Sequence, residues 1–137
     1  MRTWFQILLV ALGSSAGGLT RWGAGVWFGR WLGTAFPWGT LIINVSGSLF
    51  LGWFATALAE RLLLSESSWL RADDLRLLVA VGFTGAYTTF STFEYEAHDL
   101  LRSGEFLAAA AYAALSVFLG LLAVRVGVLL ARPGGGP

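Results

Sequence analysis

Four long apolar stretches take up almost the whole of this 137-residue chain, and short polar connections separate them. The stretches cover about residues 4–27, 40–59, 77–101 and 106–130. Because a helix needs about 20 residues to cross a bilayer, each stretch is long enough for one crossing. The sequence therefore predicts an all-α membrane protein of four transmembrane helices, with residues 1–131 as a single domain and 132–137 as a flexible C-terminal tail.

Composition argues against several other classes of protein. Charged residues make up 12% of the chain, whereas soluble domains carry about 25%. The absence of cysteine excludes a disulfide framework and a thiolate metal site, and a single histidine leaves no imidazole cluster. A net charge of +1 does not favour nucleic-acid binding. Neither an aspartate pair within the membrane nor a Ser/His arrangement is found, so we do not expect an enzyme.

The N-terminal residues allow two interpretations. Arg2, an apolar run and small residues resemble a signal peptide. The apolar character resumes beyond residue 18 through Trp22 and Trp27, which favours a first transmembrane helix instead. Gly13 and Gly17 form a small-xxx-small pair, which would let another helix approach closely.

The third apolar stretch contains a segment that is poorly suited to a continuous helix. Residues 82–96 read GFTGAYTTFSTFEYE, with two glycines and four hydroxyls around Phe90. Glycine lowers helix propensity, and crowded hydroxyls offer the backbone other hydrogen-bond partners. We therefore predict that the third helix is broken in the middle of the membrane. Non-helical backbone at that depth needs protein or a water-filled cavity to satisfy it, so the break predicts a binding or conduction site.

A polar stripe runs along the second apolar stretch. Thr40, Asn44 and Ser48 lie four residues apart, and therefore share one helix face. This face should contact protein or water. For Thr40 and Ser48, interhelical hydrogen bonds within one subunit and a functional role both remain open. For Asn44, the cost of an unsatisfied amide in hydrocarbon favours a functional role.

The fourth stretch repeats this pattern with Tyr112, Ser116 and Gly120. Four helices enclose no sizeable pore by themselves, so polar stripes on separate helices predict an assembly of subunits. Arginines lie at both ends of the predicted helices. By the positive-inside rule they favour cytoplasmic termini, but the bias is weak enough to permit both orientations in the membrane.

Charged residues within the apolar stretches have several possible roles. A central arginine costs about 2.5 to 3.5 kcal/mol on the insertion scale, so Arg21 should pair with an acid or reach towards an interface. We favour a structural or vestibule role for Arg21, and we expect Arg125 to extend its side chain to the interface. Glu94 and Glu96 follow the predicted break as interfacial acids, partners of Arg21 or a gate.

Phe90 and Phe93 share a helix face at the predicted break. Core packing is the ordinary interpretation of such a pair. Their position among hydroxyls raises a second one, because an aromatic edge carries positive partial charge and can solvate a small anion.

Three motifs resemble those of the Fluc (CrcB) fluoride channels. They are PWGTLIIN at residues 37–44, GFTG at 82–85, and TTFSTF at 88–93 followed by Glu96. The segment GGLTR at residues 17–21 is similar to an arginine motif of the same family. The resemblance covers all four stretches in order. It implies an antiparallel, dual-topology homodimer in the bacterial inner membrane, with two pores for passive export of cytoplasmic fluoride.

The resemblance also implies roles for individual residues. Asn44 matches the pore asparagine, and Phe90 and Phe93 match the phenylalanines whose edges line the ion path. The matching polar and acidic positions along the path are Thr40, Ser91, Thr92, Tyr112, Ser116 and Glu96. Gly85 and Thr88 match positions whose carbonyls hold a structural sodium ion at the dimer interface. Gly120 stands where some relatives have a further hydroxyl.

Two other functions compete with the channel. A small proton-coupled exporter of cationic drugs would need a carboxylate in its first helix, which here carries Arg21 and no acid. A purely structural membrane subunit would need neither two polar stripes nor a broken helix. Fluoride permeation needs closely spaced donors that replace water without a trapping positive charge, and amides, hydroxyls and aromatic edges supply them.

Overall fold

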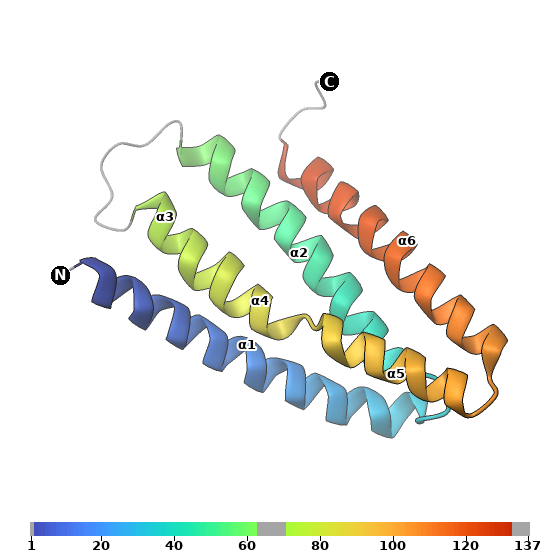
Figure 1. The fold of residues 1–137 in the computed structure, drawn as a ribbon. Helices are drawn as coiled ribbons and strands as arrows, with labels where there is room; N and C mark the ends of the chain where they lie inside the picture. Colours follow the sequence, from blue (N-terminus) through green and yellow to red (C-terminus); the bar gives the residue numbers. More distant parts are fainter. Residues whose placement is uncertain (1, 63–70, 133–137) are drawn as a thin grey trace.

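The computed structural model describes residues 2–62 and 71–132, and these residues form helices and no strands (Figure 1). The elements in chain order are α1 (Arg2–Leu32), α2 (Trp38–Leu62), α3 (Ala72–Leu75), η1 (Arg76–Thr84), α4 (Gly85–Tyr87), α5 (Phe90–Arg102) and α6 (Phe106–Ala131). The predicted all-α class is confirmed. The predicted flexible tail lies, from residue 133 onward, outside the described residues.

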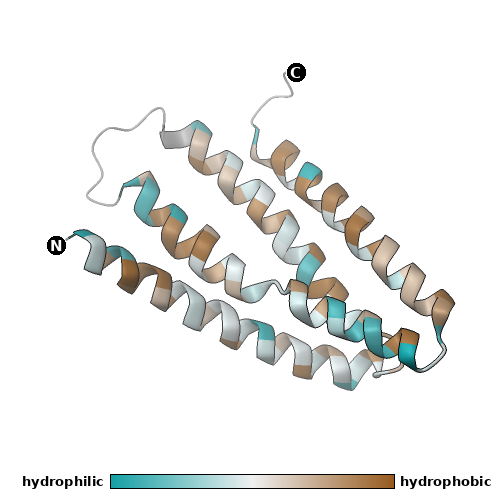
Figure 2. Ribbon diagram, viewed as in Figure 1, coloured by the Kyte–Doolittle hydropathy of each residue, from teal (hydrophilic) through white to brown (hydrophobic). Residues whose placement is uncertain are grey.

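Within the described residues, three helices are long and apolar enough to cross a membrane: α1, residues 38–60 of α2, and α6. Figure 2 shows how strongly apolar α6 is along its length, and many of its leucines, valines and phenylalanines are exposed. The chain is therefore a multi-pass membrane protein. The predicted third stretch is instead divided among η1, α4 and α5. The longest of these has 13 residues, or about 20 Å, which is too short to cross alone.

Glycines bring α1 into close contact with η1. A Cβ added to Gly13 would meet the Leu78 carbonyl, and one added to Gly17 would meet the Phe83 carbonyl. On η1, a Cβ added to Gly82 would lie 3.0 Å from the Gly13 Cα. The predicted small-xxx-small contact is confirmed.

η1 departs from α geometry earlier than the sequence predicts. It forms a π-helical segment from residue 76, whereas the expected departure begins at residue 82. At its end the Gly85 amide donates to the Ala80 carbonyl, five residues back. The Thr84 hydroxyl donates to the Val79 carbonyl at 3.0 Å. π-Helical segments are rare, and those that occur are often found at functional sites.

A second glycine contact joins α2 to α6, the most extensively packed pair of helices. A Cβ added to Gly52 would meet the Val124 carbonyl, and one added to Gly127 would meet the Leu49 carbonyl. This close crossing turns the polar stripes of the two helices towards each other, since a Cβ on Gly120 would lie 3.8 Å from Ser48 Oγ.

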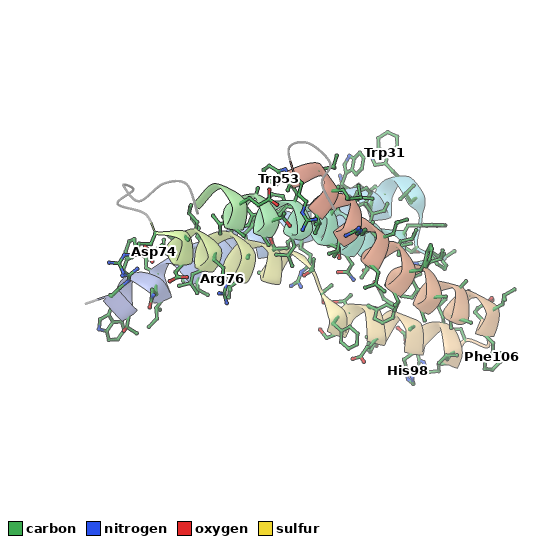
Figure 3. All side chains as sticks on the ribbon, turned by 90° about the horizontal axis from the view of Figure 1, so that it is seen from above. Trp31, Trp53, Asp74, Arg76, His98 and Phe106 are labelled. Carbon is green, nitrogen blue, oxygen red and sulfur yellow. The ribbon has the colours of Figure 1, made fainter. Side chains whose placement is uncertain are left out.

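Ion pairs join elements at the end of the molecule where α2 and α6 finish. Arg132 lies 3.4 Å from Glu60, and Arg2 lies 3.8 Å from the buried Asp74. Figure 3 shows Asp74 and Arg76 at this end, and His98 and Phe106 at the opposite one.

Candidate functional site

The centre of the site is the interruption between α4 and α5. Thr88 (φ −80°, ψ 159°) and Thr89 (φ −150°, ψ 123°) are both extended. Thr89 then caps α5, because its hydroxyl accepts from the Thr92 amide at 3.2 Å and donates to the Thr92 hydroxyl at 2.9 Å. The sequence forms this local structure because threonine is a good N-cap and favours extended backbone.

Asn44 of α2 bridges the interruption. Its Nδ2 donates to the Thr89 carbonyl at 2.9 Å, and its Oδ1 accepts from the Thr89 amide at 2.8 Å. The backbone of Thr89 thus satisfies the amide whose burial in hydrocarbon would otherwise be costly, and the functional role of Asn44 stays a prediction. An asparagine amide carries two donor hydrogens, so one Nδ2 hydrogen is left for another acceptor.

The same contact changes the backbone before it. In a continuous helix the Thr89 amide would donate to the Gly85 carbonyl, but here it donates to Asn44. The Gly85 carbonyl is thereby released from helical bonding. The Thr88 carbonyl lies 3.5 Å from Nη1 of Arg21, at the outer limit of a hydrogen bond. Arg21 forms no ion pair with an acid within the described residues.

Glu96 of α5 accepts hydrogen bonds from the polar stripes of both α2 and α6. Thr40 donates to its Oε1 at 2.8 Å, and Tyr112 donates to its Oε2 at 2.7 Å. Tyr112 is fully buried, with 0% of its surface exposed. Hydrogen bonds to a carboxylate are short and about twice as strong as neutral ones. Glu96 is thus held by hydroxyls from two other helices, and is not a partner of Arg21.

Aromatic rings extend from this cluster to the surface. The Phe93 ring lies 5.2 Å from Tyr112 and 5.7 Å from Phe90, measured between centroids. Phe93 is half-buried, whereas Phe90 is 70% exposed. The row Phe90, Phe93 and Tyr112 therefore runs from the outside of this single chain to the half-buried carboxylate of Glu96.

The remaining predicted hydroxyls are placed differently. Ser91 and Thr92 are exposed. Thr92 bonds to the Thr89 hydroxyl, but within the described residues neither side chain forms a hydrogen bond to Asn44 or Glu96. The Ser116 hydroxyl is buried and has no hydrogen-bond partner in the described part of the chain. It is an uncommitted donor inside the helical bundle.

Two cavities adjoin these groups. One of about 520 Å³ is lined by Thr40 and Glu96 together with the connection between α1 and α2. Another of about 220 Å³ is lined by Asn44, Thr88 and Phe90, with further hydroxyls from α2 and η1. Thr40 and Asn44 are one helical turn apart on α2, so the two cavities follow each other along that helix.

Sequence reasoning missed two residues at the interruption. The Tyr87 hydroxyl lies 2.9 Å from Ser46 Oγ, and the Tyr87 ring stacks on Phe83. The aromatic pair at positions 83 and 87, four residues apart in a hydroxyl-rich segment, was the available signal. No such signal was present for Ser46, because Ser46 lies off the polar stripe of α2.

Comparisons with known proteins identify the family of the chain. Residues 8–128 match the family described as CrcB-like protein, Camphor Resistance (CrcB). A relative from Nitrobacter winogradskyi, named Fluoride-specific ion channel FluC, is 43% identical over 94% of this chain and 97% of its own length. A relative of the same name from Chloroflexus aurantiacus is 45% identical over 96% of this chain and 98% of its own length. The chain therefore belongs to the CrcB family.

Proposed function

We propose that this protein is a fluoride-selective channel that lets cytoplasmic fluoride leave the cell passively and so protects against fluoride toxicity. The names of its relatives favour this activity. The observation that carries the proposal is the convergence of polar groups from the apolar helices α2 and α6 with Glu96 of α5, beside two cavities.

The donors in this region suit a small, strongly hydrated anion. Within residues 2–62 and 71–132, one Nδ2 hydrogen of Asn44 and the buried Ser116 hydroxyl have no acceptor. The Thr40 and Tyr112 hydroxyls donate to Glu96 and could donate to fluoride in its place. The edges of Phe90 and Phe93 add positive partial charge. None of these groups carries a fixed positive charge that would trap the ion.

The full architecture in this proposal has four crossings and two copies of the chain. η1, α4 and α5 together form the third crossing, broken at Thr88 and Thr89. Two copies pack as an antiparallel, dual-topology homodimer with two pores in the bacterial inner membrane. The exposure of Phe90, Ser91 and Thr92 favours this assembly, because a second copy would cover them and bring them to the ion path.

A structural sodium ion belongs to the same proposal. Carbonyl oxygens are suitable ligands for a hard cation, and the Gly85 carbonyl is released from helical bonding by the Asn44 contact. Gly85 and Thr88 would supply carbonyls from each copy, and the ion would hold the two interruptions together. Since each copy would give only part of the ligands, the proposed site is complete only with a second copy.

The alternative of a small proton-coupled multidrug exporter finds no support in the comparisons. The relatives are named as channels, which also opposes an enzymatic activity. The first helix carries Arg21 and no acidic residue that could be its proton carrier.

Fluoride efflux from liposomes tests the proposal. Purified protein would be reconstituted in vesicles loaded with fluoride or with chloride, and release would be recorded with ion-selective electrodes. We expect rapid fluoride release with chloride retained. Well-folded protein that releases no fluoride, or both ions equally, would contradict a fluoride-selective channel.

A further inference from the structure

Tyr87 is the last residue of α4, and its hydroxyl contacts α2. The hydroxyl lies 2.9 Å from Ser46 Oγ. Ser46 donates its single hydrogen to the Ile43 carbonyl at 3.1 Å. Tyr87 is therefore the donor in the contact with Ser46, and the two residues form a short chain of hydrogen bonds that ends on the α2 backbone.

The ring of Tyr87 is held independently of its hydroxyl. It stacks on Phe83 with centroids 5.9 Å apart and an interplanar angle of 9°. Phe83 in turn meets Phe50 of α2 edge to face, with centroids 6.1 Å apart. Removal of the hydroxyl alone should therefore leave the ring in place, because the stacking contacts do not depend on it.

Gly47 lets the interruption lie directly against α2. A Cβ on Gly47 would meet the Thr88 side chain, and would lie 3.2 Å from the Tyr87 ring. Ser46 thus contacts the residue before Thr88, while Asn44 contacts the residue after it. Both sides of Thr88 are therefore attached to α2. The attached residues are two positions apart on α2, and also two positions apart around Thr88.

α4 packs mainly against α1 and makes much less contact with α2. α4 has three residues and no side-chain cap. The Thr88 amide donates to the Thr84 carbonyl at 3.0 Å. This backbone bond continues the preceding helical turn but does not attach α4 to α2. Within the described residues, the bond between Tyr87 and Ser46 is the one hydrogen bond that joins α4 to α2.

We propose that the hydrogen bond between Tyr87 and Ser46 positions the ion path. It holds the α4 side of the interruption on α2, as Asn44 holds the α5 side. Together they fix the Thr88 peptide and the direction of the uncommitted Asn44 hydrogen. Tyr87 is a positioning residue, because it acts through Thr88 and Asn44 and need not touch the ion. This inference rests on the proposed channel function.

Single-channel recording of fluoride currents in planar bilayers separates positioning from folding. A variant that folds less well lowers the number of channels but not the current through each one. We expect Tyr87→Phe and Ser46→Ala each to lower the unitary current about threefold, the equivalent of an interhelical hydrogen bond of about 0.6 kcal/mol. The double variant should be no worse than either single variant, because both remove the same contact.

Tyr95→Phe is the matched control. Tyr95 on α5 is exposed, and its hydroxyl forms no hydrogen bond within the described residues. The control should keep the wild-type unitary current. A wild-type current in Tyr87→Phe, or multiplied losses in the double variant, would overturn the inference while the channel proposal stands. A wild type without fluoride current would overturn the channel proposal, and this inference with it.

Discussion

Replacement of Asn44 by aspartate tests the ion path with an almost isosteric change. The new carboxylate keeps an acceptor for the Thr89 amide, which now donates at 2.8 Å. Its other oxygen takes the place of Nδ2, which donates to the Thr89 carbonyl at 2.9 Å. One hydrogen bond is lost, and a negative charge enters the region through which fluoride is proposed to pass.

The charge should dominate the effect. An anion that accepts the uncommitted Nδ2 hydrogen would lie about 3 Å from that nitrogen, and about 4 Å from the centre of the new carboxylate. At an effective dielectric constant of about 20, two like charges at 4 Å repel by about 4 kcal/mol. Since about 1.4 kcal/mol corresponds to a tenfold change in rate, we expect fluoride flux to fall about a thousandfold.

Asn44→Ala separates the charge from the lost contacts. Alanine removes both hydrogen bonds to Thr89 without adding charge. At about 0.6 kcal/mol for each interhelical bond, its flux should fall by no more than about tenfold. Efflux from liposomes would be measured for both variants and normalised to the amount of folded protein. Equal flux in the two variants, or wild-type flux in Asn44→Asp, would show that the ion does not pass beside Asn44.

Three further variants test other parts of the structure. Tyr112→Phe removes the hydroxyl that donates to Glu96 at 2.7 Å, and hydrogen bonds to charged groups contribute about 1.5 to 3 kcal/mol. The melting temperature and the fluoride efflux should therefore both fall. If neither changes, Tyr112 does not hold Glu96. Gly17→Ala should destabilise the fold by about 1 to 3 kcal/mol, because its Cβ would meet the η1 backbone, whereas Gly18→Ala has open space around it; equal melting temperatures of the two variants would contradict the close contact of α1 and η1. Gly120→Ser should fold and conduct like the wild type, since its Cβ has an ordinary contact at 3.8 Å; loss of efflux from folded protein would place an obstruction at this position.

The sequence predicted the helical class well, because hydropathy reports directly on solvation by lipid. The fourth predicted stretch, 106–130, differs by one residue from α6 (Phe106–Ala131). α1 and α2 extend beyond the predicted stretches, since tryptophans and arginines at their ends continue the helix outside the apolar run. The π-helical geometry of η1 was not predicted. It depends on hydrogen bonds five residues apart and accompanies close packing against α1, and no local composition encodes either.

The candidate site was predicted in part. Spacing along α2 and α6 placed Thr40, Asn44 and Tyr112 on inward faces, and all three contact polar groups of other elements. Their partners could not be deduced, because spacing gives the face of a helix but not the residue opposite. The pairing of Glu96 with two hydroxyls, and not with Arg21, is a result of how α5 lies against α2 and α6.

By itself, the sequence determined that this chain forms apolar helices and where two of them approach each other through glycine, and it showed that residues 82–96 are poorly suited to a continuous helix. Those properties follow from the side chains and the solvent around each residue. Tertiary structure decided that Asn44 is satisfied by the Thr89 backbone, that Glu96 collects two hydroxyls, and that Tyr87 reaches Ser46. Each of these contacts joins residues at least 16 positions apart in the chain, so packing of the helices had to bring them together before they could form.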